Sequence, residues 1–166
     1  GTLTVSFTAG SDSVEDVLAV SNQGTGAGQI GGSGSDVTYG GVTIGSWAGG
    51  SGGANLVISF NASATPAAAQ ALVRNITYQN TDTDAPTTGA RSVRFVLSDG
   101  DGGTSVNHDA TVTVYPVNDA PTATITPASY SATEQVALDL KNNGQVIADV
   151  DAASGSVTVT LSVSEG

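Results

Sequence analysis

The segment VYPVNDAPTA, Val114 to Ala123, interrupts two stretches that alternate apolar and polar residues as β-strands do. NHDATVTVY precedes the interruption and TATIT follows it. A tight hairpin favours Asn-Gly or Asp-Gly, whereas Pro116 and Pro121 each remove a backbone donor from a sheet. We therefore interpret residues 118–121 as a linker between two domains rather than as a turn within one domain.

The amino-acid composition argues against several classes of partner and binding site. The chain has 166 residues, with 15 acidic against four basic residues and a net charge of −11. Such a surface argues against nucleic acid and anionic membranes as partners, since both are bound through Lys and Arg. The absence of Cys rules out disulfides and thiolate metal sites, and no apolar run reaches the length of a membrane-spanning helix.

The body of the chain predicts an antiparallel β-sandwich with one short helix. Expected strands are 2–7, 17–22, 37–39, 41–48, 55–61, 75–80, 91–98 and 106–115. Thr65 as N-cap, Pro66 at the first helical position and the segment AAAQALVR predict a helix at about 66–74. The run NQGTGAGQIGGSGSD is rich in glycine, and we interpret it as a hairpin connection.

Beyond the linker, TATIT, QVALDL and SVTVTLSV predict three more strands, too few to bury a face alone. LTVSFTAG (3–10) aligns in phase with VTLSVSEG (159–166), which suggests an internal repeat. We therefore expect a sandwich domain lacking its opening strands at 1–117, an acidic linker at 118–121, and the opening strands of the next repeat at 122–166.

Three segments carry a resemblance to a known family: NDAP, DGDGG and VSNQGTGAGQIGGSGSDVTYGGVTIGSWAGG. Together with ALVRNITYQNTDTDAPTTGARSVRFVLSDGDGGTS they resemble the tandem cadherin-like (Ig-like) repeats of large secreted bacterial adhesins and type I secretion (RTX-related) proteins. The resemblance implies an extracellular location at the bacterial cell surface, calcium at repeat junctions, and a structural or adhesive role.

In such repeats calcium is held by an acidic linker, an early Glu and a D-x-D turn. The matching residues here are Asn118, Asp119, Glu134, Asp149 and Asp151, and a loop of the preceding domain adds Asp99 or Asp101. Calcium binds six to eight oxygens from carboxylates, carbonyls and water, which these residue types supply. The alternative is that they are ordinary turn residues, because Asp and Asn also favour turns.

Other acidic patterns are weaker. DGDGG lacks the acidic residues of an EF-hand loop at positions five and twelve, so a hairpin turn is the better interpretation. Asp82 and Asp84 are either calcium ligands or solvated loop residues. GGSGSDVTY (31–39) matches one RTX nonapeptide, but a calcium β-roll needs several stacked turns.

Catalytic signatures are not found, and we expect no enzyme. His108 is the single His and lies on a predicted strand, and S-x-x-K does not occur. GGSGG (49–53) has the spacing G-x-S-x-G, but we interpret it as a flexible turn rather than as a nucleophile elbow. The alternative function is a carbohydrate-binding module for cell-surface glycans centred on Trp47, with Tyr39 and Tyr78 beside it, against the simpler reading that these aromatics pack within the fold.

The leading expectation is a structural module that calcium stiffens and that contacts neighbouring repeats. Because strands 122–166 have no partner in the expected layout, a second copy is a further expected partner. One copy's tail would complete the sheet of the next by strand addition, and this head-to-tail contact would extend into filaments.

Overall fold

A computed structural model divides the chain into two compact units, Gly1–Pro116 (unit 1) and Val117–Gly166 (unit 2). The structure describes residues 1–124, 129–138, 140, 146–152 and 155–162. Antiparallel sheets with one short helix make up the described fold, which confirms the predicted all-β class.

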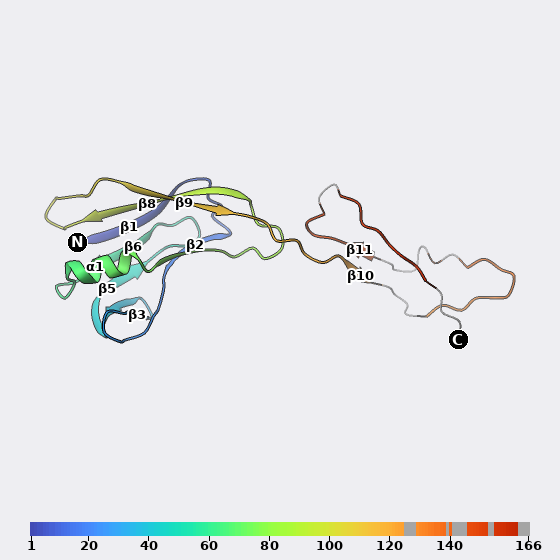
Figure 1. The fold of residues 1–166 in the computed structure, drawn as a ribbon, viewed down its shortest axis with the longest axis horizontal. Helices are drawn as coiled ribbons and strands as arrows, with labels where there is room; N and C mark the ends of the chain where they lie inside the picture. Colours follow the sequence, from blue (N-terminus) through green and yellow to red (C-terminus); the bar gives the residue numbers. More distant parts are fainter. Residues whose placement is uncertain (125–128, 139, 141–145, 153–154, 163–166) are drawn as a thin grey trace. The chain divides into compact units, whose positions relative to one another are not determined.

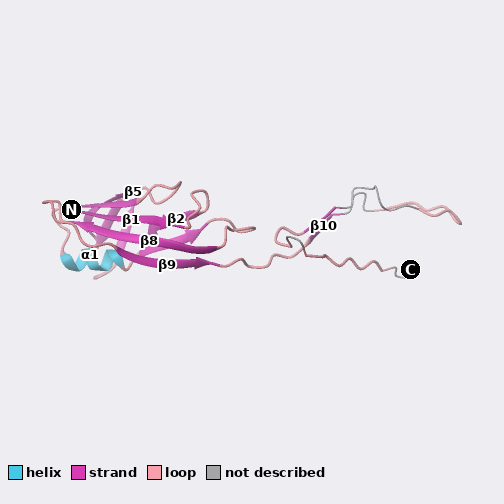
Figure 2. Ribbon diagram, turned by 90° about the horizontal axis from the view of Figure 1, so that it is seen from above, coloured by secondary structure: helices cyan, strands magenta, loops and turns pink. Residues whose placement is uncertain are grey.

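Unit 1 contains two sheets, drawn in Figures 1 and 2. The larger sheet has the order β3-β4-β5-β6-β1-β8-β9 and the smaller one pairs β2 with β7. The strands are β1 (Thr2–Ala9), β2 (Asp16–Val20), β3 (Ile30–Ser33), β4 (Asp36–Tyr39), β5 (Val42–Ala48), β6 (Leu56–Phe60), β7 (Ile76–Asn80), β8 (Gly89–Ser98) and β9 (His108–Val114). Every predicted strand of the sandwich is confirmed to within a few residues at its ends.

The core follows the period-two alternation of the central strands. In β1 the side chains of Leu3 and Val5 are buried, and β6 buries Leu56 and Ile58 beside them. β1 lies between β6 and β8, so the strand that opens the chain is central to the larger sheet. The core consists of Leu3, Val5, Leu18, Ile30, Val37, Ile44, Leu56, Ile58, Ala68, Leu72 and Val93.

Helix α1 (Pro66–Val73) confirms the predicted helix, one residue shorter than expected. Thr65 has extended backbone angles, and its hydroxyl accepts a hydrogen bond from the Ala68 N–H at 3.2 Å. Ala68 and Leu72, four residues apart on one face, are fully buried. Figures 1 and 2 both place α1 at the end of unit 1 where the chain begins.

The interpretation of the glycine-rich run as a mere connection is wrong in one respect. Ile30–Ser33 forms β3 and pairs with β4 in an antiparallel hairpin, with Gly31 opposite Thr38. Ile30 is fully buried, because a single large apolar residue among glycines still has a core position to fill. Residues 31–39 therefore form a hairpin whose turn includes Gly34 at φ +60°.

Unit 2 has less regular structure than predicted in its described residues. TATIT becomes β10 (Thr122–Thr124), and residues 125–126 lie outside the described residues. Its partner is β11 (Val146–Ala148), which sequence analysis did not predict. The described parts of QVALDL and SVTVTLSV are not strands, contrary to prediction. Their apolar side chains are exposed, so the described residues of unit 2 do not cover the face that an alternating strand would bury. Residues 139 and 163, which belong to these two predicted strands, lie outside the described residues, as do 164–166 of the internal repeat.

Candidate functional site

A buried carboxylate, Asp16, connects the two sheets of unit 1. Its side chain accepts four hydrogen bonds, from Arg91 Nε on β8 at 3.0 Å, the Asp12 N–H at 2.7 Å, Asn80 Nδ2 at 3.2 Å and the Tyr78 hydroxyl. Asp16 and Arg91 are 2% and 1% exposed. The ion pair therefore forms in the interior, where each charge depends on its partner.

The hydrogen bonds also set the ionisation of this group. Burial raises the pKa of Asp16, but the donors Tyr78, Asp12 N–H and Arg91 outweigh it, so the pKa lies below its usual value. The pKa of Tyr78 is raised, first by burial and then by its bond to the carboxylate. Asp16 therefore remains charged at neutral pH and Tyr78 remains protonated.

Glu15 forms a second set of bonds beside Asp16. Its carboxylate accepts bonds from Asn80 Nδ2 at 2.8 Å and from the Thr87 N–H and hydroxyl, the latter at 2.7 Å. These bonds, the one from Asn80 foremost, lower the pKa of Glu15. The loop that follows β7 is thereby attached to the start of β2.

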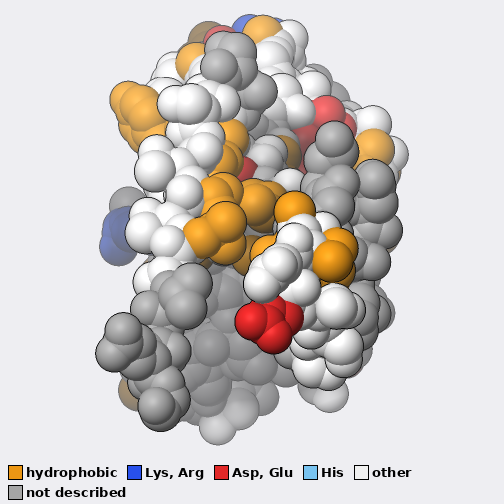
Figure 3. All heavy atoms as spheres, turned by 90° about the vertical axis from the view of Figure 1, so that its right-hand side faces the viewer, with side chains coloured by type: hydrophobic (Ala, Val, Ile, Leu, Met, Phe, Trp, Pro, Cys, Tyr) orange, Lys and Arg blue, Asp and Glu red, His pale blue; other side chains and the backbone are white. Residues whose placement is uncertain are grey.

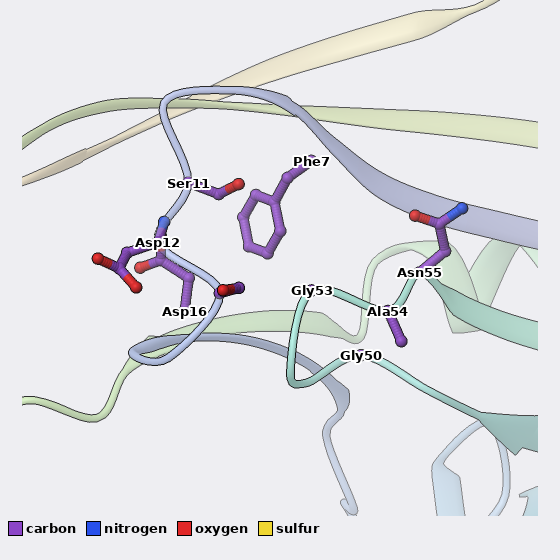
Figure 4. A pocket seen from close by; sticks show the side chains of 9 residues that line it. Phe7, Ser11, Asp12, Asp16, Gly50, Gly53, Ala54 and Asn55 are labelled. Atoms are coloured by element: carbon purple, nitrogen blue, oxygen red, sulfur yellow. The ribbon is translucent and has the colours of Figure 1, made fainter.

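A small pocket of about 60 Å³ adjoins this network. Figure 4 shows Asp12 and Asp16 on one side of it and the Gly50–Gly53 turn across from them. Two carboxylates in a pocket suggest a cation site, but Asp16 already accepts four hydrogen bonds and is paired with Arg91. One water occupies about 30 Å³ of liquid, so the pocket has room for one or two waters. Because Asp16 is already paired, the pocket does not have the chemistry of a metal centre.

Asp99 and Asp101, the ligands expected from unit 1, lie in the turn between β8 and β9. Asp99 Oδ1 accepts bonds from the N–H groups of Asp101 at 2.8 Å and Gly103 at 2.9 Å, which lower the pKa of Asp99. A Cβ on Gly103 would lie 2.3 Å from Asp99 Oδ2. Asp99 thus shapes the turn, in agreement with the hairpin interpretation of DGDGG.

Asp82 has the same role in the loop after β7. Its Oδ1 accepts bonds from the N–H groups of Asp84 at 2.9 Å and Ala85 at 3.0 Å. These two bonds lower the pKa of Asp82. The turn at Asp99 and the loop at Asp82 therefore both use a carboxylate to replace missing backbone partners.

In unit 2 the structure brings together three of the predicted ligands. The Asp119 N–H donates to Asp151 Oδ2 at 2.8 Å, and the Asp151 N–H lies 3.4 Å from Asp149 Oδ1. The pKa of Asp151 is lowered by the Asp119 N–H and, next, by a hydrogen bond with the Asp149 side chain. The Asn118 side chain donates to the Asp119 carbonyl at 2.8 Å, while Glu134 lies on the exposed turn of residues 133–136.

The Asp119 side chain fits a cation in one specific way. Its Oδ2 is buried and has no hydrogen-bond partner among the described residues, which is costly for a carboxylate oxygen. A divalent cation would supply the missing partner, with Asp151 and Asp149 close by along the hydrogen-bonded chain. Within the described residues, however, no three His, Cys, Asp or Glu side chains form a metal-binding cluster, and no hydrogen bond joins Glu134 to the three aspartates.

Trp47 and Tyr39, the candidates for sugar binding, are both half-buried and pack against the core of unit 1. They lie on neighbouring strands β5 and β4. Tyr78 is also half-buried, and its ring meets Phe7 edge-on with centroids 6.1 Å apart. His108, at the start of β9, is exposed.

Sequence reasoning missed the Asp16–Arg91 network, although a signal was present. In RSVRFVL, Arg91 shares the phase of Val93 and Phe95, which predicts that it points inward. A buried Arg requires a carboxylate, and SDSVED supplies one on a neighbouring element. SDSVED by itself has the composition of a polar turn, and the contacts of Asp16 with β7 and β8 are distant in sequence.

Comparisons do not assign the chain to a family. None of the described helices is long and apolar enough to cross a membrane. No protein-family model, curated protein or solved structure was found to match this chain.

Proposed function

We propose that this chain is a structural and adhesive module of a long extracellular bacterial surface protein, stiffened by calcium. The observation that carries the proposal is the buried Oδ2 of Asp119 in the acidic linker, which has no partner in the part of the chain that the structure describes. The Asp119 N–H donates to Asp151. In this proposal Asp119 is the first ligand, and Asp151, Asp149, Asn118, Glu134 and solvent complete the shell as the linker closes around the cation. Calcium neutralises carboxylates that would otherwise repel one another and so fixes the linker.

The chemistry of unit 1 supports a passive role. Its buried charged side chains, Glu15, Asp16 and Arg91, are each joined to partners in the fold by hydrogen bonds. The acidic loops of unit 1 use their carboxylates to hold turns. A sandwich held in this way is suited to spacing and extension.

Isothermal titration of calcium into metal-free full-length chain tests the proposal. We expect binding with a dissociation constant of about 10⁻⁴ to 10⁻³ M, the range of extracellular calcium modules. Asp119→Asn removes the unpartnered charge at nearly constant shape and should weaken binding strongly. Asp36→Asn, on the exposed end of β4, is the matched control and should leave binding unchanged. Absence of binding below millimolar calcium, or equal binding by Asp119→Asn, would contradict the proposed site.

Self-assembly is a second proposed property. Unit 2 exposes large apolar side chains along its described length, including Val136, Leu138, Ile147 and Leu161. Figure 3 shows exposed hydrophobic side chains in orange. Exposed apolar surface of this kind favours association with a partner that covers it.

A further inference from the structure

An apolar groove lies in unit 1 between helix α1 and the strands β1, β8 and β9. Its volume is about 350 Å³, and it is lined by Leu3, Val73, Phe95, Leu97, Ser105 and His108. Val73 is 40% exposed and Leu97 is 42% exposed, so two of its walls face solvent. A second hollow, of about 400 Å³, shares Leu97 and continues along α1 past Pro66.

The walls of the groove favour an apolar occupant. At about 30 Å³ for each water, the groove has room for roughly ten waters in contact with apolar side chains. Covering these side chains would release that water, and this release is the main favourable contribution to association.

A segment of the same chain has the matching pattern. Val136, Leu138 and Leu140 recur at every second position, the alternation of a strand with one buried face. All three are exposed, at 64%, 44% and 40%. Unit 2 therefore supplies three apolar side chains in a strand-like pattern that its own described residues do not cover.

The charges near the groove and near the segment 136–140 are also complementary. Arg91 and Arg94 are paired with Asp16 and Asp109, whereas Arg74, next to Val73 at the groove, forms no ion pair with any described residue. Glu134 lies two residues before Val136 and is exposed. A strand entering the groove with Glu134 near Arg74 would therefore place opposite charges together in a chain that is otherwise acidic.

We propose that a second copy of this chain inserts the segment that contains Val136, Leu138 and Leu140 into this groove, where it becomes an extended strand. The inference rests on the proposed self-assembly and specifies its two surfaces. Groove and strand are different surfaces, so each copy offers one of each and the contact propagates head to tail.

Sedimentation velocity of the full-length chain in chelator, over a wide concentration range, tests the inference. Leu97→Asp blocks the groove and Leu138→Asp blocks the strand, because either places a charge in the apolar contact. We expect growing oligomers for the unmodified chain and an association about tenfold or more weaker for each variant. Val42→Asp is the control, since Val42 is 57% exposed on β5 and does not line the groove.

Mixing the two variants gives the sharpest result. Leu97→Asp keeps an intact strand and Leu138→Asp keeps an intact groove, so the mixture should form dimers with one copy of each and nothing larger. This outcome also shows that both variants fold, and Val73→Asp on α1 serves as a second groove variant. A monomeric unmodified chain would overturn both self-assembly and this contact. Oligomers that persist in Leu97→Asp and Val73→Asp, or mixtures without dimers, would overturn the groove alone, and the calcium titration is independent of either result.

Discussion

Replacing Asp16 by Asn should destabilise unit 1 more than any surface change. The substitution leaves Arg91 charged, 1% exposed and without a carboxylate, and it turns an amide N–H₂ toward groups that are themselves donors. Breaking a buried ion pair by removing one partner costs about 3–5 kcal/mol. With a slope of about 1.5 kcal/mol per molar urea, the unfolding midpoint should fall by roughly 2–3 M.

Tryptophan fluorescence during urea unfolding is the assay. Trp47 is the single Trp and packs against the core of unit 1, so its signal follows that unit alone. Tyr78→Phe removes one of the four donors and should cost about 1–2 kcal/mol, which keeps the series measurable if Asp16→Asn does not fold.

The control is a second ion pair on the same strand. Arg94 binds Asp109 at 2.7 Å, but the two side chains are 35% and 48% exposed. Asp109→Asn should therefore have a much smaller effect, since solvent screens exposed pairs. Equal midpoints for Asp16→Asn and Asp109→Asn would refute the conclusion that the buried pair holds the sheets together.

Three further predictions concern unit 1. The pKa values of Glu15 and Asp16 are lowered in the fold from ordinary values of 4.5 and 3.8. The two carboxylates therefore stabilise the fold fully above those values, and this stabilisation is lost as the pH falls through the lower, folded pKa values. Urea unfolding followed by Trp47 fluorescence should show falling stability below about pH 4.5, and a flat profile would contradict this. Gly50→Ala should lower the thermal midpoint markedly, because Gly50 has φ +88° and a Cβ would lie 2.2 Å from the Leu18 carbonyl oxygen, whereas Gly34→Ala meets no atom within 4 Å and should do so less. Thr65→Ala should cost about 1 kcal/mol in urea unfolding through loss of the α1 cap, and Thr65→Ser should retain most of that stability.

The sandwich was predictable because its strands alternate cleanly and its helix has a local start signal in Thr65 and Pro66. Elements that depend on distant contacts were not. Ile30 forms a strand among glycines because β4 and the core accept it, and nothing within NQGTGAGQIGG indicates this.

The same distinction applies to the candidate sites. NDAP (118–121) and the D-x-D turn ADVDA (148–152) predicted the acidic residues of the calcium site. The hydrogen bond from the Asp119 N–H to Asp151 joins two of them across 32 positions. The ion pair of Asp16 with Arg91 spans 75 positions and required the three-dimensional arrangement of β2 and β8. The strand pattern of QVALDL and SVTVTLSV was correct as a pattern, but a strand also needs a surface to cover, which unit 2 does not provide in its described residues.

Small-angle X-ray scattering of monomeric chain, in calcium and in chelator, tests the stiffening by calcium most directly. We predict that calcium narrows the distribution of interatomic distances, and that Asp119→Asn shows no such change. Identical scattering in calcium and chelator, measured at a calcium concentration that saturates the titration, would contradict a role for the metal in fixing the linker.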